Sequence, residues 1–238
     1  MFKQEKHNFQ YIVYSKKYWA LTLLTVILSI FLTITNSTNG RGLTLNAYKQ
    51  IFDSFRQLFW VISVFVITDL VSTDYHSKTL KNVVSKSNSR ASYILSKIGI
   101  STLFSLFLLL VHFLTMFLLI NLASSGIPFN FYKIPWFILG IFLSLLFFAS
   151  FLSFTMVISE NEVITMGVAI GLVLLSMLAE APSISFSQYL PTMLVVTLEE
   201  IAHSNFLLSI SVLAGYLVLA FLSIFATIKM FNKKDIFI

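Results

Sequence analysis

Six unbroken apolar stretches, each of about 20 residues, dominate the sequence and leave few alternatives for its fold. A helix needs about 20 apolar residues to cross the hydrocarbon core of a bilayer, because it rises about 1.5 Å per residue. Only 11% of the residues are charged, whereas soluble domains usually carry about 25%. A β-barrel would instead show strands of about 10 residues with alternating polarity. We therefore expect an all-α membrane protein with six transmembrane helices, at about residues 18–35, 52–71, 98–123, 135–159, 163–179 and 206–228.

No Pro-, Gly- or Ser-rich linker divides the chain, so residues 1–238 are interpreted as one transmembrane domain. The first apolar stretch is longer than the apolar region of a secretory signal and lacks an Ala-x-Ala-like cleavage site, which favours a retained span. The second stretch differs from the others because Asp53 and Arg56 interrupt its first turns. Cysteine is absent, which excludes disulfide bonds and cysteine-ligated metals.

The basic residues are distributed unevenly between the two sides that six spans define. Of the 16 lysines and arginines, only Arg41, Lys49, Arg56 and Lys133 fall on the side opposite to the termini. Cytoplasmic connections carry the excess of Lys and Arg, so both termini and the segment 74–97 are predicted to be cytoplasmic. The net charge of +6 is then explained by membrane topology and affinity for anionic lipids rather than by nucleic-acid binding.

Two segments outside the spans have helical patterns of their own. Residues 8–17 place Phe9, Ile12 and Val13 on one face, which predicts an interfacial N-terminal helix leading into the first span, with a solvated tail as the alternative. The connection 181–205 contains the stretch 191–203, which is helical in pattern but too short to cross the membrane. We expect a structured last external loop that lies at the interface or re-enters the membrane, and an ordinary surface helix is the alternative.

Gly167 and Gly171 form a small-xxx-small pattern in the fifth span. Such a pattern permits close approach of two helices. Packing within the chain is the preferred interpretation, and a seam with a second copy is the alternative.

Ionisable residues within spans are costly and therefore suggest a role. Asp69 lies about a turn from the cytoplasmic end of the second span and is placed to pair with a lysine, unless that helix end is simply solvated. His112 lies in the middle of the third span without an acidic neighbour, which favours a hydrogen-bonded packing residue over a proton relay. The spans thus lack the charged pathway that an ion-coupled carrier requires.

The sequence contains no motif for catalysis, cofactor binding or a shared metal site. It has no Gly-x-x-x-x-Gly-Lys-[Ser/Thr], so ATP cannot be bound through a P-loop of this chain. His-Glu-x-x-His is also missing, and the four histidines are scattered over both sides and the membrane. Glu199-Glu200 is similar to the Glu-Glu-x-x-x-Arg motif of intramembrane CAAX-type proteases, but Ser204 stands at the arginine position. We expect no enzyme activity, no cofactor and no metal in this chain.

The segment 74–97 is the most informative part of the sequence for function. Residues 79–85 are predicted to form about two helical turns, with Leu80, Val83 and Val84 on one face and Lys81 and Asn82 elsewhere. An amphipathic element between two spans is well placed to bind a soluble partner.

This segment resembles the corresponding part of ABC-2-type ABC transporter permeases. In that family an acidic residue, a Thr-Leu-Lys, an aliphatic pair, a Ser-Arg and a Ser-Lys follow the second span in this order. Here they are Asp74, Thr79-Leu80-Lys81, Val83-Val84, Ser89-Arg90 and Ser96-Lys97. The family often has Gly before Thr-Leu-Lys and Pro before Ser-Arg, where this chain has Lys78 and Asn88.

The resemblance implies the permease subunit of an ATP-driven exporter in a bacterial cell membrane, similar to bacteriocin-immunity and phenol-soluble modulin exporters. It implies two permeases, identical or related, that each dock a separate ATPase, which binds the ATP, and a cargo such as an amphipathic peptide, an antibiotic or a lipid-like molecule. Motion of the docked segment would tilt the second and fifth spans. The residues that the resemblance assigns to ATPase coupling are Asp74, Thr79, Leu80, Lys81, Asn82, Val83, Val84, Arg90 and Lys97.

A substrate-binding membrane subunit of an ATP-dependent vitamin importer is the alternative. It would also lack a P-loop and need a partner ATPase, but it would gather polar residues in the external half of the membrane. Few such residues are evident in these spans.

Overall fold

The computed structural model describes residues 10–38, 47–76, 79–80, 84, 89–123, 134–180 and 186–234, and the regular structure of these residues is helical throughout. Residues 10–14 form a short helix before the first long one. The further elements are α2 (Lys16–Thr38), α3 (Ala47–His76), α5 (Arg90–Ala123), α6 (Ile134–Ser159), α7 (Glu162–Glu180), the 3₁₀ turn η1 (Ser187–Tyr189), α8 (Pro191–Ser204) and α9 (Phe206–Lys233).

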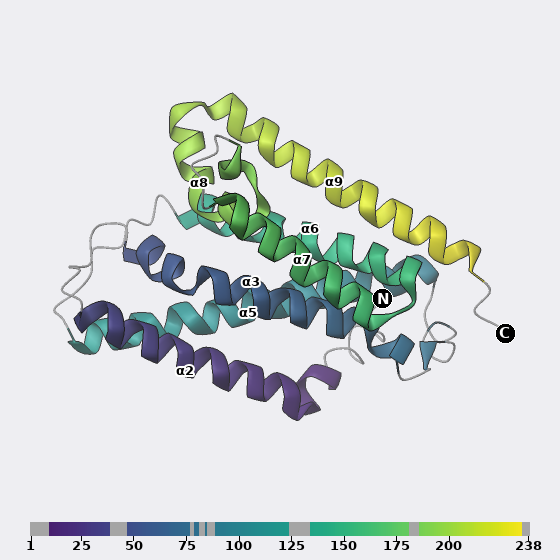
Figure 1. The fold of residues 1–238 in the computed structure, drawn as a ribbon, viewed down its shortest axis with the longest axis horizontal. Helices are drawn as coiled ribbons and strands as arrows, with labels where there is room; N and C mark the ends of the chain where they lie inside the picture. The colour runs from purple at the N-terminus through teal and green to yellow at the C-terminus, as the bar shows by residue number, and fades with distance from the viewer. Residues whose placement is uncertain are drawn as a thin grey trace.

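Six of the described helices are long and apolar enough to cross a membrane: α2, α3, α5, α6, α7 and α9. The chain is therefore an all-α, multi-pass membrane protein, and the expected six spans are confirmed. The six helices run back and forth along the long axis of the molecule (Figure 1). We call the end where α2 begins and α9 ends the terminal end, and the opposite end, which carries α8, the α8 end.

Helices α3 and α6 form the centre of the bundle. In their most apolar stretches, 67% and 61% of the residues are buried, compared with 17% in α2 and α7 and 11% in α9. Large side chains such as Trp60 and Phe148 are fully buried in the main core, and Phe52 packs edge-on against Phe137 with ring centroids 5.1 Å apart. The outer helices leave apolar side chains such as Phe221 exposed, as expected for surfaces that face lipid.

The short N-terminal helix is attached to α2 and α3 rather than extended away from them. Ile12 is buried and belongs to a second apolar cluster with Tyr18 and Leu70. The indole of Trp19 donates a hydrogen bond to the carbonyl of Val13 over 2.8 Å. Of the predicted apolar face, Ile12 is buried, Val13 is exposed and Phe9 lies outside the described residues, so the interfacial position of this helix stays a prediction.

Two connections at the terminal end have clear local causes. Between α6 and α7, Glu160 takes a left-handed conformation with φ 50°, and the side chain of Asn161 accepts a hydrogen bond from the amide of Val163 over 2.8 Å. The predicted fourth span therefore ends as expected, and the predicted fifth span begins as expected. By contrast, α5 begins at Arg90, eight residues before the predicted start of the third span at residue 98, because the polar groups of its first two turns find partners on other helices, as described below.

The chain between α7 and α9 enters the bundle at the α8 end. The hydroxyl of Tyr216 donates a hydrogen bond to the carbonyl of Tyr189 over 2.7 Å. Tyr216 is ten residues into α9, a distance of about 15 Å along that helix. Helix α8 then returns toward the start of α9, with Leu194 and Leu198 fully buried. The structure thus packs one face of α8 against the bundle, and its insertion into the membrane stays a prediction.

Helix α8 approaches the backbone of α6 closely at one glycine. A Cβ atom at Gly140 would lie 3.2 Å from the carbonyl oxygen of Leu194 and 3.2 Å from the Cα of Val195. Gly140 is therefore the position that allows α8 to pack directly on α6.

The two glycines of the fifth span have a different environment. A Cβ added at Gly167 or at Gly171 would meet nothing within 4 Å. The preferred interpretation, close packing within the chain, is therefore wrong. Exposed apolar residues surround the pair on the same face of α7, among them Ile164 and Leu174.

Candidate functional site

The junction of α3 and α5 at the terminal end contains a buried ion pair formed by two of the predicted coupling residues. The ammonium of Lys97 lies 2.7 Å from Oδ2 of Asp74, and the hydroxyl of Tyr93 donates a hydrogen bond to the same oxygen over 2.9 Å. Asp74 is 7% exposed and Lys97 5% exposed. Both residues therefore act inside the chain, where they fix the two helices that flank the segment 74–97.

Arg90, at the start of α5, is bound to the end of α9. Its guanidinium donates hydrogen bonds of 2.9 Å to the carbonyl oxygens of Phe231, Asn232 and Lys234. Phe231 and Asn232 belong to the last turn of α9 and Lys234 follows its end, where carbonyls no longer meet the amide four residues on. The ring of Tyr93 also stacks on Phe231 with centroids 5.6 Å apart. Arg90 thus connects the segment 74–97 to α9.

The described apolar residues of the predicted coupling helix are half-buried. Leu80 and Val84 both take a helical conformation and pack against the main core. The amide of Thr79 donates a hydrogen bond to the carbonyl of Asp74 over 3.1 Å. This bond ties the backbone at Thr79 to the last turn of α3. Lys81, Asn82 and Val83 lie outside the described residues. The described residues of this apolar face, Leu80 and Val84, therefore pack against the chain's own core. A force applied to them would be transmitted directly to that core.

The end of α9 also contacts the turn between α6 and α7, which the sequence did not indicate. The ammonium of Lys234 pairs with the carboxylate of Glu160 and donates to the carbonyl of Val157. The ends of α3, α6 and α9 and the starts of α5 and α7 are thus joined by polar contacts at the terminal end.

Asp69 pairs with a lysine, as its position predicted. Its carboxylate forms an ion pair with Lys17 and accepts a hydrogen bond of 2.6 Å from the hydroxyl of Tyr18. Both partners belong to the start of α2. The solvated-end alternative is therefore wrong, and the contact fixes α2 to α3.

His112 is a buried packing residue in the structure. Its Nδ1 lies 2.7 Å from the hydroxyl oxygen of Ser29, and its ring stacks on Phe55 with centroids 4.1 Å apart. The histidine thereby joins α5 to both α2 and α3. This geometry agrees with the preferred interpretation of a hydrogen-bonded packing residue.

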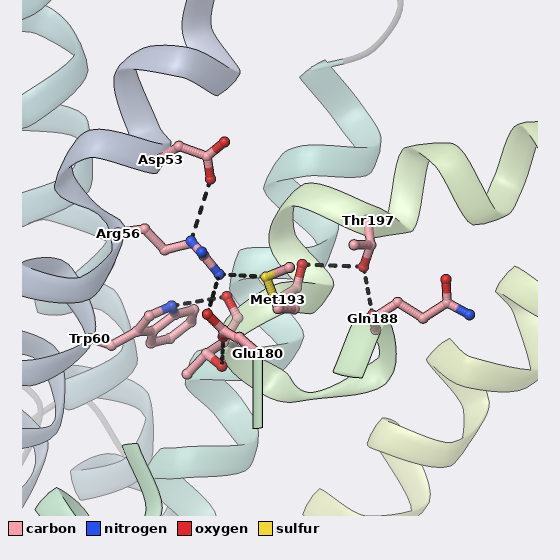
Figure 2. A network of polar contacts seen from close by, with 8 residues as sticks. Asp53, Arg56, Trp60, Glu180, Gln188, Met193 and Thr197 are labelled. Carbon is pink, nitrogen blue, oxygen red and sulfur yellow. Dashed lines mark hydrogen bonds and ion pairs between the residues drawn. The ribbon is translucent and has the colours of Figure 1, made fainter. Parts of the chain in front are cut away.

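A second polar cluster lies at the α8 end and joins α3, α7 and α8 (Figure 2). The guanidinium of Arg56 lies 2.9 Å from Oε2 of Glu180, and its Nε lies 3.4 Å from Asp53. Oε1 of Glu180 accepts a hydrogen bond of 2.5 Å from the hydroxyl of Thr192, whose carbonyl accepts from the indole of Trp60 over 3.1 Å. The sequence marked Asp53 and Arg56 only as an interruption of the second span. Their partner Glu180 was missed because its role depends on a contact 124 positions away.

The described residues contain no group of three or more His, Asp or Glu side chains that could hold a metal ion. The sequence matches no protein-family model and no curated protein. The two clusters join helices through ion pairs and hydrogen bonds.

Proposed function

We propose that this chain is the permease subunit of an ABC-2-type exporter in a bacterial cell membrane, with both termini in the cytoplasm. The observation that supports the proposal best is the attachment of the segment 74–97. Its start is bound through Asp74 to Lys97, and its end is bound through Arg90 to α9. A segment fixed at both ends to membrane-spanning helices is suited to transmit a displacement by a soluble partner.

The partner is proposed to be an ATPase subunit that binds ATP and docks on the segment from the cytoplasm. Closure of the ATPase would press the segment against the core through Leu80 and Val84. The ion pair and the Arg90 contacts would then carry the displacement into α3, α5 and α9. The resemblance assigns the motion to the second and fifth spans, and the contacts observed here add α5 and α9 to the route.

A second permease is proposed to complete the transport pathway. The face of α7 around Gly167 and Gly171 is apolar, exposed and open to close approach, which supports a contact with a second copy or a related chain. The proposed cargo is an amphipathic peptide, an antibiotic or a lipid-like molecule. The connection 181–205 with α8 is then the structured last external loop, and residues 8–17 form the interfacial helix at the cytoplasmic headgroups.

One observation favours the vitamin-importer alternative. The structure brings the polar residues Arg56, Glu180 and Thr192 together at the end that would face outward. In that alternative the isolated chain binds a small molecule tightly and one copy assembles with its ATPases. A complex of two permeases and two ATPases favours the exporter.

The coupling role is tested by the double variant Leu80→Asp/Val83→Asp. Two carboxylates on the predicted coupling helix are expected to abolish co-purification with the ATPase and the stimulation of its ATP hydrolysis. Val163→Asp introduces the same side chain at an exposed position of the terminal end and is expected to leave both unchanged.

Because Leu80 packs against the core, the thermal stability of the purified double variant must be measured beside the binding. Loss of the ATPase from a variant that melts like the parent supports the docking assignment. A double variant that still binds and stimulates the ATPase refutes it.

A further inference from the structure

The first turn of α8 is held in the bundle by polar contacts with two other helices. Thr192 donates to Glu180 of α7 over 2.5 Å and accepts through its carbonyl from Trp60 of α3 over 3.1 Å. Arg56 of α3 contacts both Glu180 and the sulfur of Met193 (Figure 2). The arginine and glutamate thus hold the start of α8 between α3 and α7.

The ion pair lies where charges are costly. The side chains of Arg56 and Glu180 are only 14% and 9% exposed. Both lie in the helices that cross the membrane, Arg56 just inside the start of its span and Glu180 at the end of its own. A well-packed apolar pair would stabilise such a site at least as well as two buried charges. Stability alone therefore does not explain why the site is ionic.

The sequence of α8 is poorly suited to an independent helix. It has 14 residues, close to the length below which isolated helices are marginal in water. Its central part contains the β-branched residues Val195, Val196 and Thr197, which lose side-chain freedom in a helix. The position of α8 accordingly depends on its contacts with α3, α6 and α7.

One side of the ion pair lies at the surface of the bundle. Asp53, which pairs with the Nε of Arg56, is 50% exposed. When Arg56 and Glu180 separate at this edge, water and Asp53 can replace the lost partners. A separated apolar contact would find no such replacement. A polar pair at this edge is therefore suited to a contact that opens and closes.

We infer that the Arg56–Glu180 pair is a gate contact that keeps α8 inserted and the bundle closed at the α8 end. When the pair separates, the first turn of α8 leaves the space between α3 and α7. In the proposed exporter, on which this role rests, the α8 end is the exit side, and the gate opens for each passage of cargo.

The test uses the absence of cysteine in the chain. Leu194→Cys places a single thiol on the fully buried face of α8. The purified protein in lipid nanodiscs is treated with a membrane-impermeant maleimide, and the rate of labelling is measured without any ATPase. Phe206→Cys, at an exposed position of the α8 end, is the fully reactive reference.

The parent with Leu194→Cys is expected to react slowly. Adding Glu180→Gln or Arg56→Gln is expected to raise the labelling rate by about tenfold or more, because the open state gains population. Arg56→Lys keeps a positive charge beside Glu180 and Asp53 and is expected to keep most of the protection. A Ser72→Cys reporter, buried in α3 near the terminal end, is expected to stay protected in all these variants.

Unchanged labelling of Leu194→Cys with Glu180→Gln or Arg56→Gln refutes the gate, and so does an increase with Arg56→Lys as large as that with Arg56→Gln. Labelling of Ser72→Cys in the same variants shows general unfolding and also refutes it. Because no ATPase is present, these results are independent of the coupling test, so a failed gate is distinguished from a failed transporter assignment.

Discussion

Replacing Lys97 by Met is expected to destabilise the protein by about 3–5 kcal/mol, because it leaves the carboxylate of Asp74 buried without its counter-charge. The hydroxyl of Tyr93 still donates to the carboxylate, but a neutral donor does not replace the positive charge of an ammonium at 2.7 Å. The free energy of unfolding, measured by titration with a denaturing detergent, should fall by this amount.

The matched control removes both charges. Asp74→Leu/Lys97→Met fills the same site with apolar groups and is expected to recover most of the lost stability. Lys234→Met removes a lysine of the same end whose carboxylate partner is 57% exposed, and should cost far less. A single Lys97→Met variant as stable as the parent would show that the Asp74–Lys97 pair does not hold α3 and α5 together.

Replacing Gly140 by Ala is expected to destabilise the packing of α8 on α6 by about 1–3 kcal/mol. The added methyl group would lie 3.2 Å from two backbone atoms of α8, which cannot rotate away as a side chain can. The expected result is a lower melting temperature of the purified protein, together with a faster reaction of a thiol introduced at Leu194.

Gly99→Ala is the control for this substitution, because a Cβ at Gly99 meets nothing within 4 Å. It should be neutral or should stabilise α5 by up to about 1 kcal/mol through helix propensity. Equal effects of the two substitutions would contradict the close approach of α6 and α8.

The six spans were predictable because the bilayer imposes one length and one polarity on every crossing helix. The pairing of Asp69 with a lysine also followed from sequence, because a carboxylate near a span end has to find a counter-charge. In both cases the constraint is local, so it is visible in a short stretch of residues.

Contacts between distant residues were not predictable. The sequence predicted that the third span begins at residue 98, whereas Lys97 and Arg90 find partners on α3 and α9 and allow α5 to begin at residue 90. Glu180 became part of a cluster only through Arg56. The glycines of the fifth span fit a packing motif, but their side of α7 is open.

Helix α3 links these features. It carries Arg56, Asp69 and Asp74, which bind α7, α2 and α5, respectively. The most buried span therefore holds charged contacts near both of its ends. A displacement at the segment 74–97 acts on the helix that also carries the proposed gate contact.

The most direct test of the coupling account is a photo-crosslinking amino acid placed at Lys81 in cells that express the chain with its partners. The account predicts a crosslinked product with a P-loop ATPase that depends on the position, with none formed from the same amino acid at Phe206 at the α8 end. A position 81 that yields no ATPase product, or an ATPase that crosslinks at Phe206 instead, would contradict it.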